Sequence, residues 1–238
     1  MMEEFTPAPA ALATTREALH RLAVYVIAPA RHRSTGRFGL RSSPGGFGTP
    51  VFEGRQISVV GGELVDSVGG VERRHQISSL HAAADFLGGP VDPETAAEHD
   101  SPAPGDVEAP LAIDADASRF LGSWFEMAFA ALELIRADAT SVDASEVQLW
   151  PGHFDAAIEV GDEDHRASYG ASPGDHSMDE PYLYVSIWWP DKIGVDATDA
   201  QWNAPSFVGS MLKLSDFPDG DPVAAAVAFW RSSRDALG

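Results

Sequence analysis

The sequence predicts an α+β protein, with antiparallel strands and packed helices in two pseudo-repeated halves. Three observations support this fold class. Helical periodicity brackets groups of short strands, Gly-Gly pairs separate three of these strands, and one strand-and-loop pattern occurs twice. With 238 residues, of which 44% are hydrophobic and 22% charged, the chain matches a soluble globular protein that can bury a real core.

The first half, residues 1–88, is expected to open with a helix over residues 10–27 that ends at Pro29. A three-stranded meander follows, because Gly-Gly pairs supply the positive φ angles of tight hairpins. This register places Asp66 opposite Arg73 as an ordinary cross-strand ion pair. The predicted strands cover residues 55–60, 63–68 and 71–77, and a short helix covers residues 79–87.

Residues 89–117 differ in composition from both halves. They contain five prolines and eight acidic residues, and neither lysine nor arginine. Such a segment buries too little apolar surface to offset the entropy of ordering. We therefore expect an exposed, mobile linker between the first half and the second half, residues 118–238, with all three parts forming one compact body.

The second half begins with a helix capped by Ser118 and apolar over most of residues 120–135. Glu126 and Glu133 lie seven residues apart, which predicts a narrow solvent-facing stripe. The C-terminal helix is expected to have Asp221 as its N-cap and Pro222 at its first position. The strands between these helices are predicted over residues 146–150, 153–160, 166–171, 181–189 and 207–214.

An internal echo supports the two-halves interpretation. Residues 38–46 and 168–175 are both short strands that run into Ser-Pro-Gly, and each is followed by a proline and an alternating strand. Two strings of the second half, LWPGHFD over residues 149–155 and ASPGD…EPYLYV over residues 171–185, resemble patterns of an uncharacterised bacterial family of the actinobacterial type. The resemblance covers mainly residues 146–190. It implies a self-contained fold and brings no catalytic residue with it.

A possible metal site is centred on His153 and Asp155. Strand alternation would put both side chains on one face, and the loop at residues 172–180 supplies further nitrogen and oxygen donors that suit zinc, manganese or iron. The candidate ligands are His153, Asp155, Asp175, His176 and Glu180. A half-buried strand with a polar outer face has the same pattern, and we favour that interpretation.

Two other segments are candidates for binding. In the strand at residues 182–189, Tyr182, Tyr184 and Trp188 share one face, which fits either a pocket lining or, as we favour, a face covered by a helix. The glycine-rich segment at residues 37–48 carries Arg37 and Arg41, which could bind an anion if the loop does not simply form a flexible hairpin. It matches neither a P-loop nor a dinucleotide fingerprint.

Charge and composition limit the classes of function. The formal net charge of −20, from 16 basic and 36 acidic residues, argues against a nucleic-acid partner or an anionic membrane. The absence of cysteine excludes disulfides and a cysteine nucleophile, and the start of the chain lacks a signal-peptide pattern, so we expect a cytoplasmic protein.

Whether the chain is an enzyme stays open from the sequence. We favour a module that binds a small ligand or a partner protein in the cleft between the halves, with no evident cofactor. The alternative is a metal-dependent hydrolase-like enzyme centred on His153, Asp155 and the loop at residues 175–180, with a divalent metal.

Overall fold

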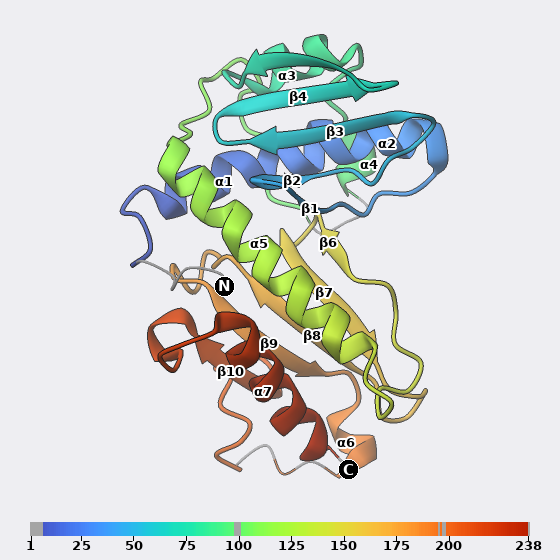
Figure 1. Cartoon of the computed structure of the whole chain (residues 1–238), viewed down its shortest axis with the longest axis vertical. Helices are drawn as coiled ribbons and strands as arrows, with labels where there is room; N and C mark the ends of the chain where they lie inside the picture. Colours follow the sequence, from blue (N-terminus) through green and yellow to red (C-terminus); the bar gives the residue numbers. More distant parts are fainter. Residues whose placement is uncertain (1–6, 98–100, 195, 197–198, 238) are drawn as a thin grey trace. The chain divides into compact units, whose positions relative to one another are not determined.

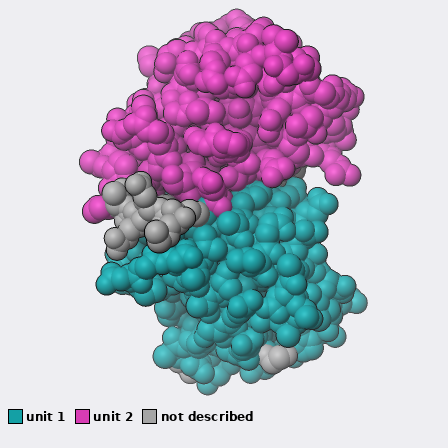
Figure 2. Space-filling model, in the orientation of Figure 1, with its two compact units in different colours: residues 1–6, 127–148, 155–238 teal, residues 7–126, 149–154 magenta. Residues whose placement is uncertain are grey.

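The computed structural model describes residues 7–97, 101–194, 196 and 199–237. The chain divides into two compact units, coloured in Figure 2. We call residues 7–126 and 149–154 the N-unit, and residues 127–148 and 155–237 the C-unit. Helices accompany two five-stranded antiparallel sheets, so the predicted α+β class is confirmed. Figure 1 shows helices and strands in the colours of the sequence. Among the described residues, none of the helices has both the length and the apolarity to cross a membrane.

The first helix of the N-unit continues past the predicted end at Pro29. It runs through α1 (Leu12–Leu22), a π-helical segment η1 (Ala23–Ile27) and α2 (Ala28–Thr35), and Gly36 caps it in the left-handed conformation. Proline has no N–H, so Pro29 leaves the carbonyl of Tyr25 without its usual helical donor. The backbone N–H of Asp92 donates to that carbonyl instead, at 3.0 Å. The prediction was wrong because a distant segment replaces the missing hydrogen bond.

The N-unit sheet is a meander in chain order. Gly61, Gly69 and Gly70 have positive φ angles in its turns, as the Gly-Gly pairs predicted. The helix α3 (Leu80–Leu87) follows and is capped by the side chain of Ser79. The strands are β1 (Arg41–Ser43), β2 (Gly46–Gly48), β3 (Arg55–Val60), β4 (Glu63–Val68) and β5 (Val71–Gln76).

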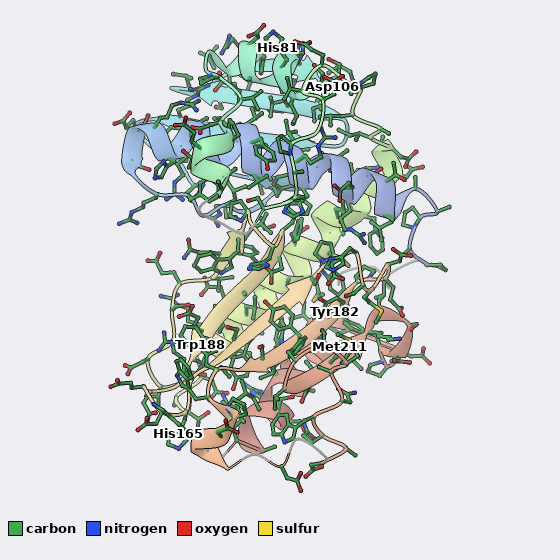
Figure 3. All side chains as sticks on the ribbon, turned by 180° about the vertical axis from the view of Figure 1, so that it is seen from behind. His81, Asp106, His165, Tyr182, Trp188 and Met211 are labelled. Carbon is green, nitrogen blue, oxygen red and sulfur yellow. The ribbon has the colours of Figure 1, made fainter. Side chains whose placement is uncertain are left out.

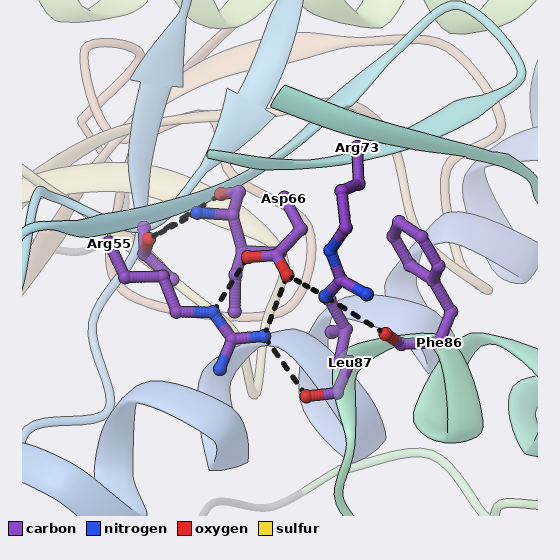
Figure 4. A network of polar contacts seen from close by, with 7 residues as sticks. Arg55, Asp66, Arg73, Phe86 and Leu87 are labelled. Carbon is purple, nitrogen blue, oxygen red and sulfur yellow. Dashed lines mark hydrogen bonds and ion pairs between the residues drawn. The ribbon is translucent and has the colours of Figure 1, made fainter. Parts of the chain in front are cut away.

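Asp66 pairs with Arg73 in the predicted register, but the pair is not an ordinary surface contact. The side chain of Asp66 is 1% exposed and accepts hydrogen bonds from Arg55 at 2.7 and 3.2 Å as well as from Arg73. Arg55 also donates to the carbonyl of Leu87 at the end of α3, at 3.0 Å (Figure 4). A buried carboxylate therefore joins three strands of the sheet to a helix.

The segment expected to be an exposed linker is packed on the N-unit over its described residues. It contains the short helix α4 (Pro93–Ala97), and Ala96 and Leu111 are buried. The hydroxyl of Tyr25 donates to the carbonyl of Pro102, and the N–H of Leu111 donates to the carbonyl of Ser78 at 2.7 Å. The composition predicted an exposed linker, but hydrogen bonds to distant backbone and side-chain groups hold the described part of this segment against the rest of the N-unit.

The second half opens with α5 (Ala115–Arg136), whose residues belong to both units. The glutamates Glu126 and Glu133 are exposed on it, as predicted. A Cβ added to Gly122 would lie 2.8 Å from the backbone of Gly45 and Gly46, so this glycine permits α5 to approach the turn between β1 and β2.

The second sheet has the order β10-β9-β8-β7-β6, again a meander. The final helix, α7 (Pro222–Asp235), is capped by Asp221 as predicted. The strands are β6 (Gln148–Trp150), β7 (Asp155–Val160), β8 (Ala167–Ser172), β9 (Tyr182–Ile187) and β10 (Gly209–Lys213), with the short helices α6 (Pro190–Ile193) and η2 (Leu214–Asp216) beside β10 in the sequence.

Both halves thus pass from a long helix through a five-stranded meander to a helix, which is compatible with the pseudo-repeat. The Ser-Pro-Gly echo does not mark equivalent positions, however. Ser43-Pro44-Gly45 joins the first two strands of its sheet, whereas Ser172-Pro173-Gly174 lies between the third and fourth strands of the other. The shared string follows the end of a strand in each case, and both of its glycines, Gly45 and Gly174, have positive φ angles.

Candidate functional site

The C-unit sheet has two chemically different faces. Leu183 and Val185 are fully buried and Ile187 is 6% exposed, which confirms the predicted core face of β9. Tyr169 pairs with Val185 on that face, and burial raises the pKa of Tyr169 to about 12. Tyr184, one residue away, lies on the opposite face. Its ring is partly buried.

A glycine allows Tyr184 to reach a carboxylate across the sheet. The register places Tyr184 beside Gly170, and a Cβ on Gly170 would lie 2.3–2.5 Å from two ring carbons and the hydroxyl oxygen of Tyr184. The ring can therefore lean over β8, and its hydroxyl donates to Oδ2 of Asp155 at the start of β7. Phe207 contacts the ring edge to face, with centroids 6.1 Å apart.

A second tyrosine–carboxylate pair lies next to the first. The hydroxyl of Tyr182 donates to Oδ2 of Asp175 at 2.6 Å, and the rings of Tyr182 and Tyr184 are 6.2 Å apart. The other oxygen of Asp175 accepts from the backbone N–H groups of Ser177 and Met178, at 2.7 and 3.0 Å. This loop geometry fixes Asp175 against the sheet. We call Asp155, Asp175, Tyr182 and Tyr184 the tyrosine–carboxylate cluster.

The protonation states of the cluster follow from these contacts. Burial raises the pKa of Tyr184, and the neighbouring charge of Asp155 raises it further. Burial and the hydrogen bond to Asp175 raise the pKa of Tyr182 in the same way. Burial also acts to raise the pKa of Asp175, but hydrogen bonds from Ser177, Tyr182 and Met178 outweigh it and lower the pKa. At neutral pH the phenols are therefore donors, and Asp175 is a charged acceptor.

His153 does not join this cluster through strand alternation. Residues 151–154 form a turn in which Phe154 has φ 56°, and the strand expected from residue 153 begins at Asp155. The side chain of His153 is exposed. The two residues also belong to different units. The argument that placed His153 and Asp155 on one strand face was wrong, because Pro151 and Gly152 start a turn there.

The other candidate ligands have separate surroundings. His176 is exposed in the loop, next to Asp175 in the sequence. Glu180 accepts from the N–H of Ser215 at 3.2 Å and lies 3.8 Å from Nζ of Lys213. Within the described part of the chain, no group of three or more His, Asp or Glu side chains has the arrangement of a metal site. The structure thus brings Asp155 and Asp175 onto the cluster through Tyr184 and Tyr182, and leaves the predicted ligand set dispersed.

The glycine-rich segment at residues 37–48 forms the hairpin of β1 and β2. Arg37 and Arg41 are both exposed, and Nε of Arg41 donates to the carbonyl of the adjacent Ser42 at 3.2 Å. Anion binding by these two arginines stays a prediction.

One histidine with a strongly perturbed pKa was missed by the sequence reasoning. His20 on α1 stacks on Phe154 with ring centroids 5.2 Å apart, and its Nε2 lies 2.9 Å from the carbonyl oxygen of Gly152. Burial lowers the pKa of His20 to about 4, although the backbone contacts at residues 151 and 152 act in the opposite direction. The only sequence signal was its position beside the buried stripe of the first helix. Its partners are 132 residues away, which local patterns do not indicate.

Comparison with protein-family models, curated proteins and solved structures finds no match for the chain.

Proposed function

We propose that this protein is a non-enzymatic binding module and that the tyrosine–carboxylate cluster holds a small organic cation, such as an amine or a guanidinium compound. The observation that carries the proposal is the pair of hydrogen bonds from Tyr184 to Asp155 and from Tyr182 to Asp175. Together they put two carboxylates and two aromatic rings on one sheet face within the C-unit.

The chemistry of the cluster supports a cationic ligand. Ligand sites combine aromatic walls with a few oriented polar groups, and the electron-rich faces of tyrosine and phenylalanine attract cations. Tyr182, Tyr184 and Phe207 supply the aromatic rings, and Asp175 supplies a carboxylate whose pKa is held low. A neutral or anionic ligand would lack this electrostatic attraction.

Accessibility and preorganisation also support the proposal. Asp155 is 6% and Tyr182 8% exposed, so these two groups form the fixed inner part of the cluster. Tyr184 and Asp175 are half-buried and leave a part that a ligand can contact. Since hydrogen bonds already orient the carboxylates, little conformational entropy would be lost on binding.

The test is a calorimetric titration of the protein with arginine, cadaverine and tetramethylammonium chloride, repeated on Asp175→Asn and Tyr184→Leu. We expect saturable binding of at least one cation, weakened in both variants by about tenfold, the equivalent of one charge-assisted hydrogen bond or cation–π contact. Asp219→Asn is the matched control, since it removes the same charge from an exposed position of the C-unit outside the cluster.

Two outcomes contradict the proposal. One is the absence of heat with all three cations in wild-type protein. The other is binding that Asp219→Asn weakens as much as Asp175→Asn does, which would indicate general attraction to an acidic protein. Far-ultraviolet circular dichroism of each variant verifies that the sheet is intact.

A further inference from the structure

A pair of exposed tryptophans marks a second surface of the C-unit, separate from the tyrosine–carboxylate cluster. Trp188 is 40% exposed and Trp189 is 47% exposed, at the end of β9 and the start of α6. Their rings meet edge to face with centroids 6.4 Å apart. Figure 3 shows Trp188 near the same end of the C-unit as His165. Two adjacent tryptophans this exposed need an explanation, because large aromatic side chains in contact with water are characteristic of binding surfaces.

Each of the two rings already has a cation above it. The guanidinium carbon of Arg166 lies 5.5 Å from the ring centroid of Trp188, and Nζ of Lys192 lies 5.5 Å from that of Trp189. These distances are within the range of cation–π attraction. Both indole rings therefore already take part in cation–π contacts within the chain.

Ion pairs and hydrogen bonds hold Arg166, Lys192 and the ring of Trp188 in position. Arg166 donates to Glu159 at 3.0 Å and to the carbonyl of Gly161 at 2.9 Å. The indole N–H of Trp188 donates to the hydroxyl of Ser168 at 2.9 Å. Lys192 donates to Asp164 at 3.0 Å. The surface is thus held in place before any partner arrives, which lowers the entropic cost of binding.

The rim of the surface is acidic. Asp162, Glu163, Asp164 and Asp191 are exposed in the two segments that flank the tryptophans. Residues 89–238 as a whole carry 28 acidic residues against seven basic ones, a net charge of −21. A second copy of the chain or an anionic membrane would be repelled by this charge, and an arginine-rich polypeptide would be attracted to it.

We propose that the surface formed by Trp188, Trp189 and the acidic loop at residues 162–164 docks an arginine-rich segment of a partner protein. Arginine fits better than lysine, because its planar guanidinium stacks on an indole while it pairs with carboxylates at its edge. This inference does not depend on the proposed small-cation site, since the two surfaces share none of their residues.

The test uses a short fluorescent peptide of alternating glycine and arginine, with lysine and glutamate versions beside it. Binding to the full chain is measured by fluorescence anisotropy at low and high salt. We expect the arginine peptide to bind more tightly than the lysine peptide, and the glutamate peptide not to bind. The double variant Trp188→Ala/Trp189→Ala should bind the arginine peptide about five to 30 times more weakly, as the loss of two cation–π contacts implies.

Two further variants keep the test decisive. Trp150→Ala removes a tryptophan of similar exposure, 37%, from the N-unit and should leave the affinity unchanged. The variant Trp188→Phe/Trp189→Phe retains aromatic faces and should bind with intermediate affinity, even if the alanine variant is poorly folded. Equal affinities of wild type and both double variants would overturn the proposal, as would equal affinities for the arginine and lysine peptides. Tryptophan-dependent self-association in sedimentation, or tryptophan-dependent binding of a neutral oligosaccharide, would also overturn it.

Discussion

The buried carboxylate of Asp66 offers the sharpest test of the energetics of the fold. Removing one partner of a buried ion pair costs about 3–5 kcal/mol when the remaining charge stays in a dry environment. The two arginines bonded to Asp66 differ in this respect, because the side chain of Arg55 is 25% exposed and that of Arg73 is 58% exposed. Water can therefore solvate most of the guanidinium group of Arg73, but much less of that of Arg55.

This asymmetry gives different magnitudes for three substitutions. Asp66→Ala should lower the free energy of unfolding of the N-unit by about 3 kcal/mol. Arg55→Ala should cost about 2–3 kcal/mol, because it removes both hydrogen bonds from Arg55 to the buried carboxylate and the hydrogen bond to the carbonyl of Leu87, and leaves only Arg73 on Asp66. Arg73→Ala should cost about 1 kcal/mol, the sum of a mostly exposed ion pair and a cation–π contact with Phe86 at 4.9 Å.

Urea unfolding followed by circular dichroism measures these costs, and double-mutant cycles isolate the pairwise terms. The matched control is Arg74→Ala, since Arg74 pairs with Glu63 and Glu72 on the exposed side of the meander and should change stability by less than about 0.5 kcal/mol. The reasoning is refuted if Arg73→Ala costs as much as Arg55→Ala, or if Asp66→Ala costs less than about 1 kcal/mol.

Two further predictions follow from His20 and Gly170. The pKa of His20 is lowered from 6.5 to about 4, so the unfolded chain binds the extra proton first, and stability present above pH 6.5 should be lost as the pH falls toward 4. The loss should approach, but not reach, about 3 kcal/mol because His20 keeps some exposure, and urea unfolding between pH 4 and 7.5 should show a steeper pH dependence for wild type than for His20→Gln. Parallel curves for the two proteins would contradict this assignment. Gly170→Ala should destabilise the C-unit by about 1–3 kcal/mol in thermal unfolding, because the new methyl group displaces the ring of Tyr184. In Gly170→Ala/Tyr184→Ala the penalty for the glycine change should largely disappear, and its persistence would show that the clash lies elsewhere.

Local sequence patterns were sufficient to predict the structure wherever residues close in the sequence determine the backbone geometry. The Gly-Gly turns established the pairing of Asp66 with Arg73, and alternation along β9 identified its buried face. Alternation also put Arg55 on the same face as Ile57, two residues on. The contact between Arg55 and Asp66 could therefore have been predicted from the sequence, but it was not.

The remaining features depend on contacts between distant residues. The bond from Asp92 to Tyr25 lets the first helix continue beyond Pro29, and it also helps to hold a proline-rich segment that composition alone describes as mobile. Likewise, the contact between Tyr184 and Asp155 needs the register of three strands and a glycine in the middle one. A single sequence without its fold does not specify such registers, so the candidate site could be located only in part.

The hexapeptide at residues 149–154 has a consequence for how the protein is made. Phe154 is 1% exposed and packs edge to face on Phe47 and Phe125, with centroids 5.1 and 5.3 Å away, while Leu149 bridges to Leu40. The N-unit therefore receives part of its core 28 residues after its main segment ends at Glu126. At synthesis rates of about 5–20 residues per second, Phe154 would be added to the chain roughly 1.5–6 s after Glu126. During that interval the sides of Phe47 and Phe125 that contact Phe154 should lack their cover, and the first residues of the second unit are synthesised before the first unit is complete.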